Sequence, residues 1–277
     1  MAEDSSSMEV KFLRNHSEYL KKIDASIESV LEPYSEHPLF EPMNYALRGG
    51  KRLRPLVCIL VNQALGLSED PYPAATAIEL LHTVSLIHDD IVDKAVSRRG
   101  VPPYYKTFGV DSAFLVADFV LGLILKVSSS YEDNSIADEL AKTTIEMSYG
   151  EEEERRLMLR RKEIDYNEYI GIIEKKTASL FRASSSIGAI LSKRKELYKA
   201  MADFGKSIGM AYQIRDDLSD MDKDNELLSL VKVEQNNKND FLIEEADRYV
   251  TSAKDILKEL PSNQAVEKLK LLVSDYF

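Results

Sequence analysis

The chain has 277 residues, of which 44% are hydrophobic, and a formal net charge of −11 at pH 7. This composition allows one large apolar core, and the acidic balance argues against a general nucleic-acid binder, which needs clustered cations. No segment is long and uncharged enough to span a bilayer, and the N-terminal stretch lacks the apolar run of a secretory signal. The single cysteine, Cys58, cannot form an internal disulfide, so a reducing, cytoplasmic setting is expected.

Apolar residues recur at helical spacing along most of the chain, with few glycines and prolines between them. This pattern predicts an all-α protein. Residues 1–8 are rich in serine and are expected to form a disordered tail. No stretch resembles an interdomain linker, so a single domain over 1–277 is expected. Helices are predicted, in chain order, at 9–32, 39–48, 52–66, 72–95, 109–128, 134–161, 165–190, 194–218, 238–258 and 263–275.

A diglycine followed by three cations opens the third predicted helix, in the segment Gly49–Pro55 (GGKRLRP). Glycine lets backbone amides approach an oxyanion, and the guanidinium of Arg54 offers a planar fork for phosphate. The segment therefore predicts a diphosphate site, with a basic helix start after a glycine turn as the alternative. A second basic group, Arg98-Arg99, follows the fourth predicted helix and could contact the same ligand.

Two acidic clusters with identical spacing, Asp89–Asp93 (DDIVD) and Asp216–Asp220 (DDLSD), lie far apart in the chain. Residues four apart share a helix face, so the first and last aspartates of each cluster form a pair that can bind a hard cation. Each cluster follows an apolar run, where unpaired carboxylates are costly to desolvate. A single short Asp run is usually a solvated surface element, but two copies predict facing sites that hold a polyphosphate through magnesium.

Three further polar segments lie on predicted helices. His82 lies two helical turns before Asp89 on about the same face, although a lone histidine is more often a hydrogen-bonded core residue. Lys176-Thr177 precede an apolar run, where an inward lysine would neutralise a leaving diphosphate. The run Glu151–Glu154, followed by two arginines, is interpreted instead as a solvated helix face with offset charge pairs.

The ordered elements GGKRLRP, ELLHTVSLIHDDIVD, RRG, KT and YQIRDDLSD, spanning residues 40–222, resemble the trans-isoprenyl diphosphate synthase family, the polyprenyl synthetases. The resemblance implies an all-α isoprenoid synthase bundle around a deep central cavity, usually in a homodimer. It also implies a prenyl transferase that condenses isopentenyl diphosphate with an allylic diphosphate. In that family, two aspartate motifs bind three Mg²⁺ ions.

Residue by residue, the resemblance assigns each functional position of the family to a position here. Mg²⁺ is assigned to Asp89, Asp90, Asp93, Asp216, Asp217 and Asp220; isopentenyl diphosphate to Lys51, Arg54, His82 and Arg99; the allylic partner to Arg98, Lys176 and Gln213, with Thr177 in the same motif as Lys176. The catalytic set comprises the first five of these aspartates and Lys176.

The same resemblance bears on product length, because in this family the chain grows down an apolar tunnel beside the first-motif helix. The preceding turns here offer Ser85, Val84, Leu81 and Ile78, none of them aromatic. At about 1.5 Å per residue, Ile78 lies roughly 16 Å from Asp89, which leaves space for about three isoprene units. Geranylgeranyl diphosphate or a longer product is expected, with peripheral membrane contact possible during its release.

The chain departs from the family pattern after the second motif, where a Gly-Lys pair that closes the site has no clear counterpart in Met221–Leu230. Glu151 also replaces the usual glutamine after Gly150. The missing pair keeps open a non-catalytic or regulatory subunit of a heteromeric synthase, although both aspartate clusters are complete. A class I terpene cyclase is the other alternative, but it usually has a mixed Asn/Ser/Glu second site and no need for the basic segment.

Overall fold

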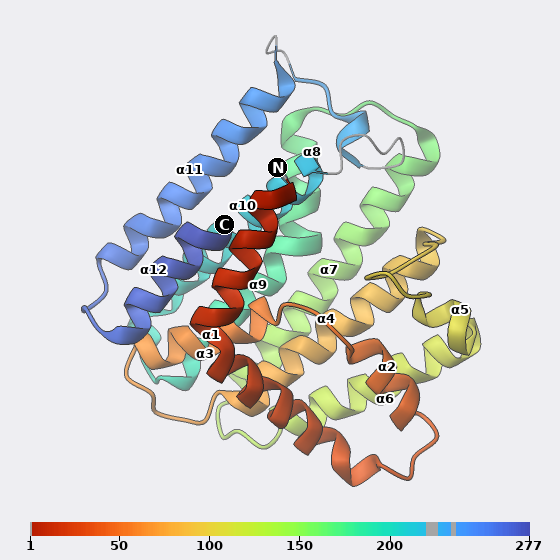
Figure 1. Cartoon of the computed structure of the whole chain (residues 1–277), viewed down its shortest axis with the longest axis vertical. Coiled ribbons are helices and arrows are strands. Elements are labelled where there is room, and N and C mark those ends of the chain that lie inside the picture. The colour runs from red at the N-terminus through yellow and green to blue at the C-terminus, as the bar shows by residue number, and fades with distance from the viewer. Residues whose placement is uncertain (1, 220–226, 234–236) are drawn as a thin grey trace.

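The structure of the chain is a computed structural model that describes residues 2–219, 227–233 and 237–277. Over these residues it is a bundle of helices with two isolated β-bridges, Arg98 to Val101 and Ile164 to Val231, and no strand. The predicted all-α fold is therefore confirmed. Figure 1 shows α11, α12 and α1 along one flank and α2, α5 and α6 at the opposite end, with α4, α7, α9 and α10 between them.

The helices run in the following order: α1 Ala2–Leu31, α2 Phe40–Leu47, α3 Leu53–Ala64, α4 Tyr72–Val92, α5 Tyr104–Phe108, α6 Val110–Ser128, α7 Ser135–Arg160, α8 Tyr166–Ile173, α9 Ser179–Leu191, α10 Tyr198–Ser219, α11 Lys238–Lys258 and α12 Gln264–Tyr276. Short 3₁₀ turns occupy Glu32–Tyr34, Lys195–Leu197 and Leu227–Leu230, and a π-helical turn occupies Glu174–Ala178. Among the described residues, no helix is both long and apolar enough to cross a membrane.

Three sequence-based boundaries differ from the structure. Helix α1 begins at Ala2, where a disordered tail was expected. The single helix predicted over 165–190 is interrupted by the π-helical turn, and the short α5 was not predicted. Residues 220–226 and 234–236 lie outside the described part of the chain, so Asp220 has no structural account.

Helices α3 and α9 form the centre of the core. In α3, 11 of 12 residues are buried, and in α9, 12 of 13 are buried. Both helices are buried on nearly all sides because neighbours surround them: α4, α10 and α12 pack around this pair. Cys58 lies in the middle of α3 and is fully buried, which raises the pKa of its thiol. The core thus provides a rigid base from which α4 and α10 project their polar ends.

Candidate active site

A cavity of about 600 Å³ lies where the start of α3, α4, α7, α10 and the π-helical turn meet. The loop carrying the second basic group closes part of its wall. Thirteen of the residues singled out from the sequence line this cavity: Lys51, Arg54, His82, Ser85, Asp89, Asp93, Arg98, Arg99, Lys176, Thr177, Gln213, Asp216 and Asp217. Side chains more than a hundred residues apart in the sequence are therefore brought to one site.

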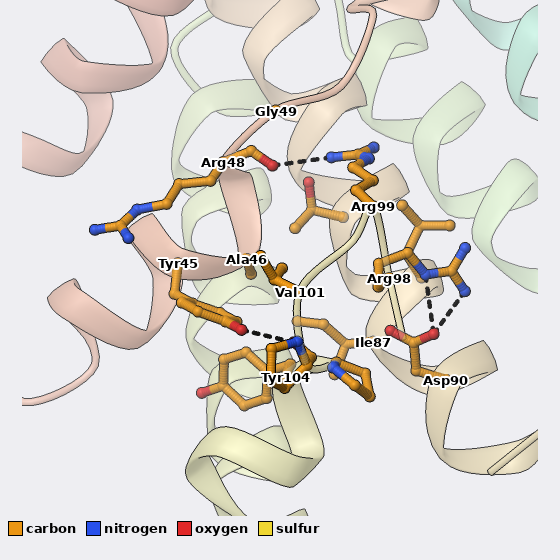
Figure 2. A pocket seen from close by; sticks show the side chains of 14 residues that line it. Tyr45, Ala46, Arg48, Gly49, Ile87, Asp90, Arg98, Arg99, Val101 and Tyr104 are labelled. Atoms are coloured by element: carbon orange, nitrogen blue, oxygen red, sulfur yellow. Dashed lines mark hydrogen bonds and ion pairs between the residues drawn. The ribbon is translucent and has the colours of Figure 1, made fainter. Parts of the chain in front are cut away.

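The first aspartate motif divides between two cavities. Asp89 and Asp93 line the large cavity, whereas Asp90 lines a smaller neighbouring cavity of about 250 Å³ (Figure 2). Asp90 is 2% exposed and accepts two hydrogen bonds from Arg98, from Nε at 2.9 Å and from Nη2 at 2.6 Å. Consecutive helical residues point about 100° apart, so Asp90 cannot share the face of Asp89. The structure places Asp90 as an anchor of Arg98 and not with the cavity carboxylates.

The second motif is held by hydrogen bonds that the sequence did not predict. Asp217 accepts one hydrogen bond from the hydroxyl of Tyr169 at 2.6 Å and another from Nε2 of Gln213 at 2.5 Å. Gln213 in turn accepts from the hydroxyl of Thr177 at 2.8 Å. Burial raises the pKa of Asp217 to about 7, although these hydrogen bonds oppose the shift. Asp216 lines the same cavity one residue earlier.

The carboxylate of Asp89 is destabilised in the same way. Burial raises its pKa to about 7; the charge of Lys176 opposes the shift, and Glu151 and Asp93 add to it. Burial also raises the pKa of Asp93. Desolvated carboxyl groups of this kind are stabilised in their ionised form by a nearby cation. Both motifs therefore present carboxylates in surroundings that favour a bound positive charge.

Lys176 is held between two glutamates of α7. Its Nζ lies 2.7 Å from Glu151 and 2.8 Å from Glu154. Burial disfavours the charged amine, but Glu154, Asp89 and Glu151 outweigh burial and raise the pKa of Lys176. The amine therefore stays protonated at neutral pH.

The interpretation of Glu151–Glu154 as a solvated face is correct for only half of the run. Glu152 pairs with Arg155 and Arg156 at the surface, both at 2.7 Å, and Glu153 pairs with Lys175. Glu151 and Glu154, three residues apart, share the face that meets Lys176. Helical spacing places Glu151 and Glu154 on a different face from Glu152 and Glu153. Only the contact with Lys176 shows that the face of Glu151 and Glu154 is the inward one.

The π-helical turn determines how Lys176 enters the cavity. Such turns insert one extra residue per turn and redirect side chains, often at functional sites. Gly150 makes room for this turn on α7, because a Cβ there would lie 2.7 Å from the backbone nitrogen of Lys176. Any larger residue at position 150 would push the lysine and α7 apart.

The basic segment at the start of α3 holds a buried guanidinium against aromatic rings. Nη1 of Arg54 lies 3.2 Å from Nε2 of His82, and the guanidinium carbon lies 4.4 Å from the ring centre of Phe181. Burial, with the charge of Arg54, lowers the pKa of His82 well below its usual value, so His82 is neutral and can accept from Arg54. Nε of Arg54 is buried and has no hydrogen-bond partner among the described residues.

A third arginine of this region supports the loop. Arg52 lies 2.7 Å from the buried Glu79 and 3.0 Å from Asp24, and it donates to the carbonyl of Leu47. It thereby ties the loop to α1, α2 and α4. Gly50 has a φ of +97°, and a Cβ on it would meet the guanidinium of Arg99 at 3.0 Å. The diglycine is thus explained by backbone conformation and by the close approach of Arg99.

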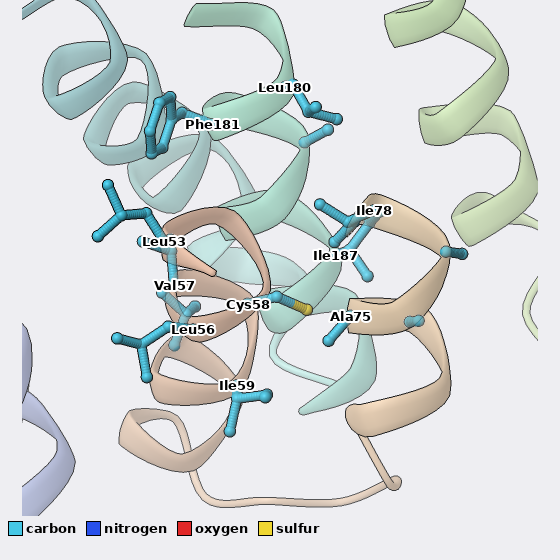
Figure 3. Packing of buried hydrophobic residues seen from close by; sticks show 14 of the residues in the cluster. Leu53, Leu56, Val57, Cys58, Ile59, Ala75, Ile78, Leu180, Phe181 and Ile187 are labelled. Atoms are coloured by element: carbon cyan, nitrogen blue, oxygen red, sulfur yellow. The ribbon is translucent and has the colours of Figure 1, made fainter. Parts of the chain in front are cut away.

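A second cavity, of about 370 Å³, continues from the large one between α4 and α7. Three of the predicted chain-length residues, Leu81, Val84 and Ser85, line it. Ile78 does not: it is fully buried beside Ile187 of α9 (Figure 3). The open space therefore ends near Leu81, because α4 packs against the core below that level.

Several known proteins have sequences and folds similar to those of this chain. A family model described as polyprenyl synthetase matches residues 36–274. The geranylgeranyl diphosphate synthase of Methanosarcina mazei is 34% identical over 228 residues, covering 79% of this chain and 69% of that protein. The geranylgeranyl diphosphate synthase of Sulfolobus acidocaldarius is 30% identical over 276 residues, covering 92% and 82%.

The same relationship holds in three dimensions. The crystal structure of a polyprenyl synthase from Caulobacter crescentus, complexed with calcium and isoprenyl diphosphate, superposes with a TM-score of 0.80 at 24% identity, covering 97% of this chain and 96% of that one. This likeness concerns the fold, and the sequence matches carry the family. The chain belongs to the polyprenyl synthetase family, the trans-isoprenyl diphosphate synthases.

Proposed function

We propose that the protein is a prenyl transferase that condenses isopentenyl diphosphate with an allylic diphosphate and makes geranylgeranyl diphosphate or a longer product. The observation that carries the proposal is the content of a single cavity. It holds Lys51 and Arg54 of the basic segment and Arg99 of the second basic group, and it also holds aspartate pairs from the two motifs. The basic side chains suit a diphosphate without metal ions, and the aspartates suit a diphosphate that is bound through metal ions.

Mg²⁺ fits the donors of this cavity. The described residues contain no group of three or more His, Cys, Asp or Glu side chains that could hold an ion alone. Mg²⁺ often binds through one or two carboxylates, with substrate phosphates and water completing its shell. Asp89 and Asp93 would hold ions on one helix, and Asp216 and Asp217 on the other. We propose three ions per site by analogy with the family.

The residues of the chain account for the reaction as follows. The allylic carbon–oxygen bond breaks, the cation forms a carbon–carbon bond with the double bond of isopentenyl diphosphate, and a proton is lost. Bound Mg²⁺ would supply Lewis-acid stabilisation of the leaving diphosphate. Lys176, protonated at neutral pH, and Arg98, held by Asp90, donate to that diphosphate. Arg54, Lys51 and Arg99 hold the second substrate.

Product length is proposed from the second cavity. Its α4 wall consists of Leu81, Val84, Ser85, His88, Asp89 and Val92, without Phe, Tyr or Trp. Such a wall accepts an apolar tail and keeps water from the reacting cation. A chain that grows into this space would exceed one or two isoprene units, which favours a geranylgeranyl or longer product over a shorter one. Its release is expected to involve peripheral contact with a membrane.

A homodimer in the cytoplasm is also proposed. Helix α6 carries exposed apolar residues at Val110, Phe114, Leu121 and Leu125, spaced four, seven and four apart along one face. The neighbouring α7 adds Ile145, which is 70% exposed. Apolar stripes of this kind mark protein interfaces.

The activity is tested with purified protein, Mg²⁺, labelled isopentenyl diphosphate and each allylic primer in turn. Extended prenyl diphosphates are expected, and chelation of Mg²⁺ should abolish them. The double variant Asp89→Ala/Asp216→Ala should be inactive, whereas Asp203→Ala, at an exposed site of the same α10, should remain active. A scaffold subunit would give no product alone, and a terpene cyclase would give hydrocarbon without incorporating the label; either result would refute the proposal.

A further inference from the structure

The two cavities meet at a narrow set of side chains. Four residues line both the large cavity and the second cavity: Ser85, Asp89, Met147 and Lys176. Asp89 and Lys176 carry charge and belong to the diphosphate end of the site. Ser85 of α4 and Met147 of α7 are the two neutral members. An apolar tail that leaves the diphosphate site for the second cavity must pass them.

Ser85 takes little room in this passage. Its hydroxyl donates to the carbonyl of His82 on its own helix at 2.8 Å, so its polar group is already satisfied and its side chain is short. Met147 is 9% exposed and far larger. A methionine side chain is unbranched and has three rotatable bonds, so it can move aside for an apolar ligand where a branched or aromatic side chain cannot.

We propose that Met147 is the residue that admits the growing prenyl chain from the diphosphate site into the cavity between α4 and α7, and that its size sets the longest primer that is extended. The inference rests on the prenyl transferase activity proposed above. Ser85 lies four residues, about 6 Å, from Asp89 along α4, and an extended isoprene unit spans about one helical turn. A primer of one unit stays above the passage, whereas primers of two or three units cross it.

The test compares Met147→Phe and Met147→Ala with wild-type protein, using dimethylallyl, geranyl and farnesyl diphosphate as separate primers. A rigid ring in a packed passage is costly, so in Met147→Phe the kcat/KM for farnesyl diphosphate should fall roughly tenfold or more relative to that for dimethylallyl diphosphate. The products should also shorten. In Met147→Ala the product distribution should shift toward longer chains.

The control is Met158→Phe, which places the same change on α7 outside all three cavities and should leave product lengths unchanged. Met147→Leu keeps the volume and shows that the position tolerates substitution. A loss of stability alone would lower the activity of Met147→Phe equally with every primer. The ratio of kcat/KM between farnesyl and dimethylallyl diphosphate would then stay unchanged, and this result would overturn the inference. Absence of extension by the wild-type protein with any primer would instead refute the proposed function.

Discussion

Arg98 and the buried Asp90 link the loop after α4 to the first aspartate motif, with two donors of the guanidinium on one carboxylate oxygen at 2.9 and 2.6 Å. The pair holds Asp90 toward the smaller cavity, whereas Asp89 and Asp93 line the large one. Arg98 itself lines the large cavity. We therefore expect the second aspartate of the motif to act on the substrate through the arginine.

This relationship predicts different phenotypes for adjacent aspartates. Asp90→Asn should raise the KM for the allylic diphosphate and leave the Mg²⁺ concentration for half-maximal activity nearly unchanged, since Arg98 loses its charged partner. Asp89→Asn should raise the Mg²⁺ requirement strongly. Loss of the buried hydrogen-bonded charge should also cost Asp90→Asn about 1–3 kcal/mol of unfolding free energy. Equal shifts of the Mg²⁺ titration in both variants would contradict the assignment.

Glu151 competes with the substrate for Lys176. Its carboxylate lies 2.7 Å from the amine, so a diphosphate must displace it or share the lysine with it. Glu151→Gln should lower the KM for the allylic diphosphate by roughly three- to tenfold, equivalent to about 0.7–1.4 kcal/mol. Glu152→Gln, which alters the pairs with Arg155 and Arg156 and not the contact with Lys176, is the matched control. An unchanged or higher KM in Glu151→Gln would show that the glutamate instead helps to bind the ligand.

The stability of the metal-free protein should depend on pH through Asp89 and Asp217. Their pKa values are raised by burial from 3.8 to about 7, so between pH 4 and 7 the folded state binds more protons than the unfolded state. The unfolding free energy should therefore fall as pH rises through this window. Mg²⁺ requires the ionised carboxylates, so its stabilising effect should grow over the same range.

Thermal unfolding with EDTA and with Mg²⁺, from pH 5 to pH 8, measures both effects. The double variant Asp89→Asn/Asp217→Asn should show a smaller pH dependence and little response to Mg²⁺. Parallel curves for the variant and the wild-type protein in EDTA would show that these two groups titrate normally.

Helix periodicity predicts some of this site and misses the rest for identifiable reasons. It placed Asp89 and Asp93 on one face correctly, because four residues make about one turn. The resemblance then carried Asp90 into the same role, although the neighbouring position points elsewhere. Local sequence gives no signal for Tyr169, which reaches Asp217 from 48 residues away. The π-helical turn at Lys176 likewise depends on close approach of α7 at Gly150.

The exposed stripe on α6 predicts the oligomeric state. Leu121→Glu places a charge in the middle of the apolar face, where its desolvation would oppose association. A dimer of the wild-type protein should become largely monomeric in this variant, as measured by light scattering after size exclusion. Leu67→Glu, another exposed leucine that lies outside the stripe, should leave the mass unchanged. A monomeric wild-type protein at micromolar concentration would contradict the prediction.

The buried pair of Arg52 and Glu79 should control the isopentenyl diphosphate site from a distance. Arg52 and Glu79 are 10% and 3% exposed and lie 2.7 Å apart, and breaking such a pair on one side costs about 3–5 kcal/mol. Glu79→Gln should therefore destabilise the protein and raise the KM for isopentenyl diphosphate, since the loop with Lys51 and Arg54 loses its attachment to α4. Asp24, the other carboxylate partner of Arg52, has a side chain that is 54% exposed. Asp24→Asn should therefore lower the unfolding free energy by at most about 1 kcal/mol. The positioning role requires the KM for isopentenyl diphosphate to rise more than the KM for the allylic substrate in Glu79→Gln. Equal changes in KM for both substrates would show that the pair of Arg52 and Glu79 has only a structural role.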